Sequence, residues 1–118
     1  MQFTKTNNIY KIIRITGSQD NILGIVFDEK NNNNETNSIE VIAWEFPNIK
    51  RRITLTSKEE VLKQVSAGLK LKNEAFKTDY KLSKIYFSPF DSPADSIYST
   101  LTCLLIRHYH TGGEFKEV

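Results

Sequence analysis

The densest group of chemically active side chains in this sequence is Arg107, His108, Tyr109 and His110, which follow one another near the C-terminus. A cation, two imidazoles and a phenol could supply the phosphate contact, the general base and the general acid of metal-independent RNA cleavage. Neighbouring residues of a helix point about 100° apart, so these groups converge on one phosphate only if the helix ends before them. We expect solvated helix-end residues here, with RNA cleavage as the alternative.

The other residue types that catalysis commonly uses are sparse. Cys103 is the only cysteine, and its place inside a predicted helix favours a small buried apolar role over a nucleophilic one. The two histidines lack the His-x-x-x-His spacing of a metal site, and the five glycines form no phosphate-binding loop. The sequence therefore predicts no catalytic residue, no metal and no cofactor.

Basic residues give a modest argument for nucleic-acid binding. The 16 Lys and Arg residues against 14 Asp and Glu residues leave a net charge of +2, which is small for a nucleic-acid footprint. Lys50, Arg51 and Arg52 form one local basic cluster, although charges at strand edges also protect against edge pairing. The alternative RNA site consists of Lys50, Arg51, Arg52, His108, Tyr109 and His110.

The first half of the chain has the alternating apolar pattern of strands. Four strands are expected, over residues 9–16, 22–27, 38–46 and 52–56. Gly24 interrupts the second of them and predicts a bulge or a close backbone approach. Residues 28–37 are polar throughout and rich in Asn, which predicts a mobile hairpin loop. Together these features favour an antiparallel meander.

The second half changes to helical spacing. Ser57 and Glu60 fit a capping box at the start of a first helix, but the pattern leaves open whether residues 58–80 form one helix or two. A short strand is expected over Lys84 to Phe87. A second helix would then begin with Asp91 or Ser92 as its N-cap and Pro93 in its first turn. Gly112 and Gly113 predict its end.

These elements predict one α+β domain over residues 1–118. We expect an antiparallel sheet of four to five strands, with two main helices packed on one face and the order β-β-β-β-α-β-α. Residues 1–8 are expected to fray. The single cysteine excludes a disulfide scaffold within the chain. The lack of a long apolar run and of a secretory signal pattern predicts a cytoplasmic protein without a membrane span.

A domain with so few reactive groups is expected to act through its surface. We therefore predict a non-enzymatic protein-binding domain, such as an immunity or antitoxin protein that neutralises a bacterial toxin by steric occlusion. Aromatic and Arg side chains are the favoured anchors of protein interfaces, although core packing is the alternative role for the aromatic ones. The candidate partner-binding residues are Trp44, Arg51, Arg52, Phe90, Tyr98 and Tyr109.

Overall fold

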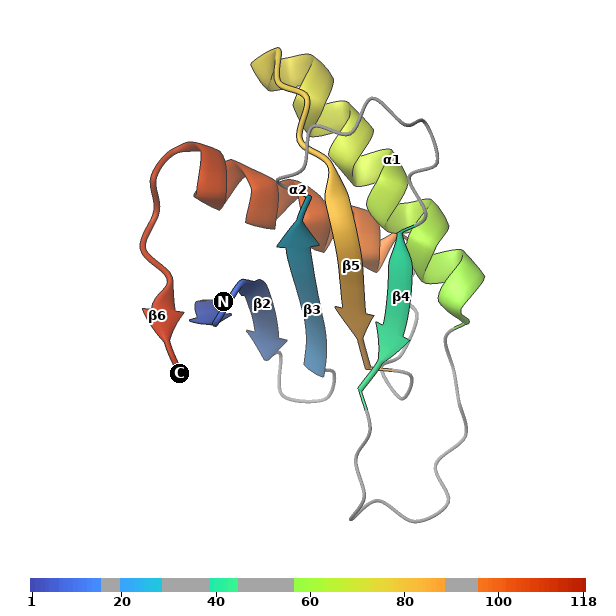
Figure 1. Cartoon of the computed structure of the whole chain (residues 1–118), viewed down its shortest axis with the longest axis vertical. Helices are drawn as coiled ribbons and strands as arrows, with labels where there is room; N and C mark the ends of the chain where they lie inside the picture. The colour runs from blue at the N-terminus through green and yellow to red at the C-terminus, as the bar shows by residue number, and fades with distance from the viewer. Residues whose placement is uncertain (16–19, 29–38, 45–56, 89–95) are drawn as a thin grey trace.

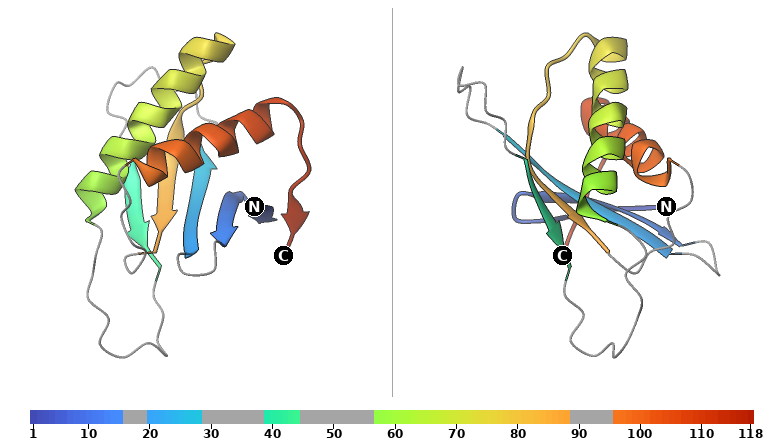
Figure 2. Two further views of the ribbon diagram at one scale, coloured as in Figure 1. Left: turned by 180° about the vertical axis from the view of Figure 1, so that it is seen from behind. Right: turned by 90° about the vertical axis from the view of Figure 1, so that its right-hand side faces the viewer.

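Six strands form one mixed sheet that carries two helices on the same face (Figure 1, Figure 2). The computed structural model describes residues 1–15, 20–28, 39–44, 57–88 and 96–118. The strands are β1 (Gln2–Thr6), β2 (Ile9–Ile15), β3 (Asp20–Phe27), β4 (Glu40–Ala43), β5 (Leu82–Phe87) and β6 (Lys116–Glu117). The helices are α1 (Lys58–Phe76) and α2 (Ile97–His110). The order β-β-β-β-α-β-α-β confirms the predicted α+β class.

The sheet differs from the antiparallel meander that the sequence predicted. Its strand order is β4-β5-β3-β2-β1-β6. Antiparallel pairing joins β1 to β2, β2 to β3 and β3 to β5, but β4 runs parallel to β5 and β6 runs parallel to β1. Parallel neighbours need a crossover connection, which α1 provides between β4 and β5. The meander prediction was wrong at this point because an apolar strand pattern does not encode strand direction.

The segment predicted as a hairpin loop, residues 28–37, joins two strands that are not neighbours. β5 lies between β3 and β4, so this connection is not a hairpin. Residues 29–37 themselves, and the fourth strand predicted over 52–56, lie outside the described residues.

The N-terminal residues, which we expected to fray, instead form β1 and a tight turn. The pairing of β1 with β2 brings Thr6 opposite Ile9 and leaves Asn7 and Asn8 as a two-residue turn. Asn7 has a φ of 55°, the left-handed conformation that such turns use and that asparagine tolerates. Because β6 also pairs with β1, both ends of the chain are held in the sheet.

α1 is one continuous helix, which answers the question that the sequence left open. The Ser57 Oγ accepts a hydrogen bond from the Glu60 backbone N–H at 3.2 Å, as the capping box predicts. The helix ends at Phe76 because Lys77 adopts a left-handed conformation with a φ of 54°. The Asn73 side chain then binds both the backbone N–H and the carbonyl of Tyr80, which fixes the chain as it turns toward β5.

α2 begins later than the sequence predicted. Ser96 has a φ of 63°, so the helix cannot extend back through it to the predicted N-cap and first turn at residues 91–93, which lie outside the described residues. A group on α1 replaces the local cap, because the Gln64 Oε1 accepts a hydrogen bond from the Tyr98 backbone N–H at 2.9 Å. The predicted end before Gly112 and Gly113 is confirmed, since α2 ends at His110.

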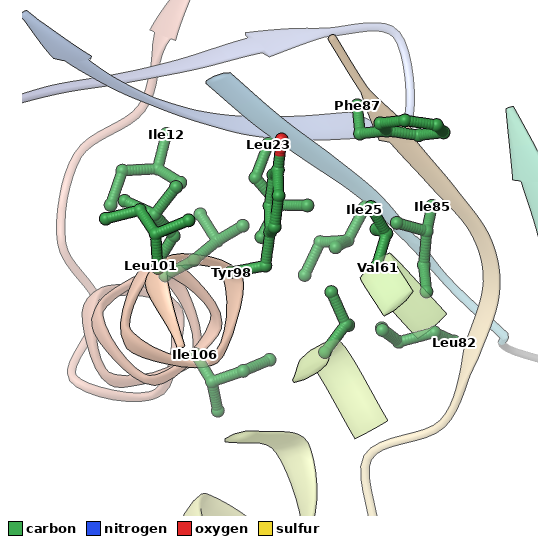
Figure 3. Packing of buried hydrophobic residues seen from close by; sticks show 13 residues of the cluster. Ile12, Leu23, Ile25, Val61, Leu82, Ile85, Phe87, Tyr98, Leu101 and Ile106 are labelled. Atoms are coloured by element: carbon green, nitrogen blue, oxygen red, sulfur yellow. The ribbon is translucent and has the colours of Figure 1, made fainter. Parts of the chain in front are cut away.

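The hydrophobic core fills the space between the helices and one face of the sheet (Figure 3). Strand residues such as Leu23, Ile25 and Ile85 meet Val61 of α1 and Leu101 of α2, and all five are fully buried. The whole cluster consists of Ile12, Leu23, Ile25, Val61, Val65, Leu82, Ile85, Phe87, Ile97, Tyr98, Leu101, Leu105 and Ile106. Apolar burial of this kind is the main term that stabilises a domain.

Gly68 lets the two helices approach each other closely. A Cβ atom at this position would lie 2.7 Å from the Ser99 carbonyl oxygen of α2 and 3.0 Å from the Thr102 Cβ. The first of these neighbours is a backbone atom of a packed helix, which cannot move aside as a flexible side chain can. The glycine that weakens α1 as an isolated helix is therefore required where α1 meets α2.

We predict that Gly68→Ala lowers the free energy of unfolding by about 1–2 kcal/mol. Alanine favours the helix by about 1 kcal/mol, but overpacking against the α2 backbone costs about 1–3 kcal/mol. Urea unfolding followed by circular dichroism measures the difference. The exposed Ser66 of the same helix gives the control, because Ser66→Ala should leave stability unchanged or slightly raised. A more stable Gly68→Ala variant would contradict the close helix contact.

Candidate functional site

The face of the sheet opposite the helices, here called the outer face, is turned toward the viewer in Figure 1. Side chains alternate between the two faces of a strand, and residues paired across strands point to the same face. Positions that alternate with the buried core residues therefore define the outer face. Its described members are Gln2, Thr4, Thr6, Ile9, Lys11, Ile13, Ile22, Gly24, Val26, Glu40, Ile42, Trp44, Lys84, Tyr86 and Lys116.

Trp44 and Tyr86 form an aromatic pair on the β4–β5 side of the outer face. Their rings stack with centroids 5.7 Å apart and an interplanar angle of 22°. The Trp44 backbone N–H donates to the Phe87 carbonyl at 2.9 Å, which anchors the residue just beyond β4. The indole then reaches across β5 to lie over Gly24 of β3, where a Cβ atom would come within 3.3 Å of the ring.

The close approach predicted at Gly24 is confirmed, and the approaching group is the Trp44 indole. The alternative prediction of a bulge at Gly24 was wrong, because the irregularity between β3 and β5 falls at Val26 and Phe27. A glycine under an aromatic ring is a known way of packing a sheet surface, since the ring covers the backbone that the missing side chain leaves bare. Trp44 is thus held on a fixed platform and remains half-buried.

The charged groups on the outer face are mainly positive. The Lys11 ammonium lies 5.9 Å from the centre of the Trp44 ring and donates to the Thr6 hydroxyl at 3.2 Å. Lys84 and Lys116 are exposed on the same face, as is the acidic Glu40. The outer face therefore combines stacked aromatic rings with several lysines.

The two histidines of α2 occupy separate environments. The His108 ring stacks on Phe3 with centroids 3.7 Å apart, and its Nε2 is 2.7 Å from the Glu114 carbonyl oxygen. The His110 ring stacks on Phe76 with centroids 4.3 Å apart, and its Nδ1 is 2.8 Å from the Tyr80 hydroxyl. Because α2 remains helical through both residues, the imidazoles point to different partners, as helical spacing predicts.

The remaining predicted site residues divide into three groups. Tyr98 is fully buried and its hydroxyl is 3.5 Å from the Ser88 carbonyl, so the ring packs in the core and presents no surface to a partner. Tyr109 is half-buried and packs edge-on against Tyr10 on the helix side of the sheet. Four positions lie outside the described residues, namely Lys50, Arg51, Arg52 and Phe90.

Cys103 has the surroundings of a structural thiol. Its Sγ lies 3.7 Å from the Gly68 carbonyl oxygen at the contact between the helices. Burial raises the pKa of the Cys103 thiol, which keeps it in the protonated form that is a poor nucleophile. In the described part of the chain, no three His, Cys, Asp or Glu side chains gather as a metal site would require.

Comparisons with protein-family models, with curated proteins and with solved structures find no significant match to this chain. Among the described residues, no helix is long and apolar enough to cross a membrane.

The sequence analysis named Trp44 but missed Tyr86, Lys11 and Gly24 as its neighbours. The alternation of β5 already places Tyr86 opposite the buried Ile85, which is a signal that could have identified it. The pairing of β5 with both β3 and β4 was not available from the sequence. Without that pairing, the sequence does not show that Tyr86, Lys11 and Gly24 lie beside Trp44.

We predict that His108→Ala and His110→Ala each lower the free energy of unfolding by about 1–2 kcal/mol, because each removes an aromatic stack and a hydrogen bond. The two rings share no contact partner in the described residues, so the effects should add to within about 0.5 kcal/mol in the double variant. Chemical denaturation of the four proteins measures the coupling. A strong departure from additivity would place both imidazoles in one site.

Proposed function

We propose that this protein is a non-enzymatic protein-binding domain, of the immunity or antitoxin type, that uses the outer face to cover a partner protein. The surface of the partner that fits the outer face is apolar at its centre and acidic around that centre. Inhibition would be steric, since a partner enzyme covered in this way cannot admit its substrate. The observation that carries the proposal is the Trp44–Tyr86 stack over Gly24, with the Lys11 ammonium beside it.

Fixed aromatic rings favour tight protein contacts for a physical reason. Trp and Tyr dominate interface energetics, and residues that are already ordered lose little conformational entropy on binding. Trp44 meets that condition because it is stacked on one side and seated on the glycine backbone beneath it. The half-buried Ile9 and Ile42 beside it extend the apolar area.

The charge of the outer face supports the choice of partner chemistry. Three lysines, Lys11, Lys84 and Lys116, lie on this face, which also carries the acidic Glu40. Opposite charges on two surfaces raise the association rate and disfavour wrong partners. An acidic rim on the partner would therefore match this face, whereas a basic one would be repelled.

The geometry of the histidines gives less support to the alternative, a metal-independent ribonuclease. General acid–base cleavage needs two groups on the same phosphate. His108 and His110 instead stack on Phe3 and Phe76, which belong to different elements, β1 and the end of α1.

The proposal is tested by co-expressing the chain with the product of the neighbouring gene and measuring the affinity of the purified complex. We predict that Lys11→Glu combined with Lys84→Glu weakens the complex by about 10- to 100-fold, because each reversal turns an attraction into a repulsion. The loss should be larger at low salt. Circular dichroism confirms that the variant is folded.

Lys63→Glu combined with Lys70→Glu is the matched control, because both lysines are exposed on α1 at the other side of the molecule. This control variant and the His108→Ala, His110→Ala double variant should bind as the unchanged protein does. Weaker binding by the α1 variant with full binding by the Lys11, Lys84 variant would show that the helices, and not the outer face, contact the partner. RNA cleavage that depends on both histidines would favour the ribonuclease instead.

A further inference from the structure

A hollow of about 680 Å³ lies at the turn end of the sheet, and neither Trp44 nor Tyr86 lines it. The β1–β2 turn, the end of β3, the start of β5 and Tyr109 of α2 surround it. Small-molecule sites in proteins have volumes of roughly 300–1,000 Å³, so this hollow has the size of such a site. It has no part in the proposed function.

Three aromatic rings line the hollow and hold one another in place. Tyr109 lies 4.3 Å from Phe27 and 5.1 Å from Tyr10 between ring centroids. Tyr10 and Phe27 are 5.4 Å apart at an interplanar angle of 69°. The Tyr10 ring packs edge to face on the other two, while Phe27 and Tyr109 are tilted by 31°. Rings in mutual contact have fixed orientations, which provides a preformed apolar wall for a planar group.

The polar groups of the hollow carry opposite charges at separate places. The Lys5 ammonium lies 4.9 Å from the centre of the Tyr10 ring. Lys5 is a cation at neutral pH, as lysines ordinarily are. A hydrogen bond to Tyr10, followed by the charges of Tyr10 and Glu117, raises the pKa of Lys5 further. Asp28 lines the hollow at the end of β3. Lys5 is in register with Tyr10 and, two strands away, with Ile25. Asp28 lies three residues beyond Ile25, so two strand spacings of about 4.8 Å and three residue rises of about 3.3 Å put the two backbones about 14 Å apart.

The hollow also has neutral hydrogen-bonding groups. Asn7 and Asn8 of the tight turn line the hollow with side-chain amides that can both donate and accept. The left-handed conformation of Asn7, with a φ of 55°, fixes the turn that presents them. Asparagine amides are suited to the edges of nucleobases because they offer a donor and an acceptor side by side.

We propose that this hollow binds a nucleoside monophosphate unit, with its base against the aromatic wall and its phosphate beside Lys5. The base edge meets the Asn7 and Asn8 amides, and Asp28 accepts hydrogen bonds from hydroxyl or amino groups of the ligand. The unit is either a free nucleotide or the 5′-phosphorylated end of an RNA strand.

The test is titration of the ¹⁵N-labelled full chain with AMP, followed by NMR. Amide shifts at Asn7, Asn8 and Asp28 are expected, together with changes in the Tyr10 and Tyr109 ring signals. Adenosine lacks the phosphate and ribose 5-phosphate lacks the base, so each should bind at least about tenfold more weakly than AMP. An absence of shifts, or shifts confined to other parts of the sheet, would overturn the proposal.

Two lysine variants show whether the contact between Lys5 and the phosphate is responsible for AMP binding. Lys5→Gln should weaken AMP binding by about tenfold, since it removes a charge-assisted hydrogen bond. Lys116→Gln is the matched control, because Lys116 lies on the adjacent strand and on the outer face, and it should change nothing. Equal losses of AMP affinity in the two variants would indicate only a general loss of positive charge and would overturn the proposed site.

A 5′-phosphorylated oligoadenylate distinguishes the two sources of the ligand. Tighter binding of the oligomer than of AMP, lost in Lys5→Gln, identifies an RNA end. Binding of AMP that equals or exceeds that of the oligomer identifies a free nucleotide. Because the variants that test the outer face, Lys11→Glu and Lys84→Glu, leave the hollow intact, failure of either proposal can be told from failure of the other.

Discussion

The close crossing of α1 and α2 at Gly68 is the constraint on which the rest of the structure depends. It allows both helices to lie against one face of a sheet that is only six strands wide. The parallel β4–α1–β5 connection brings α1 to that face, and the Gln64 side chain then caps α2 from α1. In the part of the chain that the structure describes, packing on the outer face involves the residues of the strands and Trp44. Trp44, Tyr86 and Gly24 meet there because β5 pairs with both β3 and β4.

Local patterns in the sequence were sufficient to predict the features that depend on residues close together in the chain. The Ser57 cap, the end of α2 before Gly112 and the strand pattern of β2 and β3 were all predicted correctly. Interactions between distant segments were not predicted. The direction of β4 follows from its crossover, and the start of α2 depends on Gln64, which lies 34 residues away from Tyr98. β1 was missed because its polar residues and the Asn7–Asn8 turn resemble a frayed terminus until β6 is seen beside it.

In the candidate site, too, features that depend on neighbouring residues were predicted, and features that depend on distant residues were not. Helical spacing correctly separated His108 from His110, and each imidazole stacks on its own aromatic partner. Tyr98 was a candidate for partner binding because of its residue type, but it is fully buried in the core. Residue type alone does not indicate how deeply a side chain is buried. The reactive side chains are thus largely committed to packing. The proposed protein-binding role rests instead on the fixed Trp44–Tyr86 stack of the outer face.

The most direct test of this account uses the single tryptophan of the chain. Labelling with 5-fluorotryptophan gives one ¹⁹F NMR signal, which reports on Trp44 alone even when an unlabelled partner is bound. The account predicts that this signal shifts on complex formation and becomes protected from a soluble paramagnetic quencher. A complex that forms while the Trp44 signal keeps its position and its exposure to the quencher would show that recognition occurs elsewhere, and would contradict the central claim.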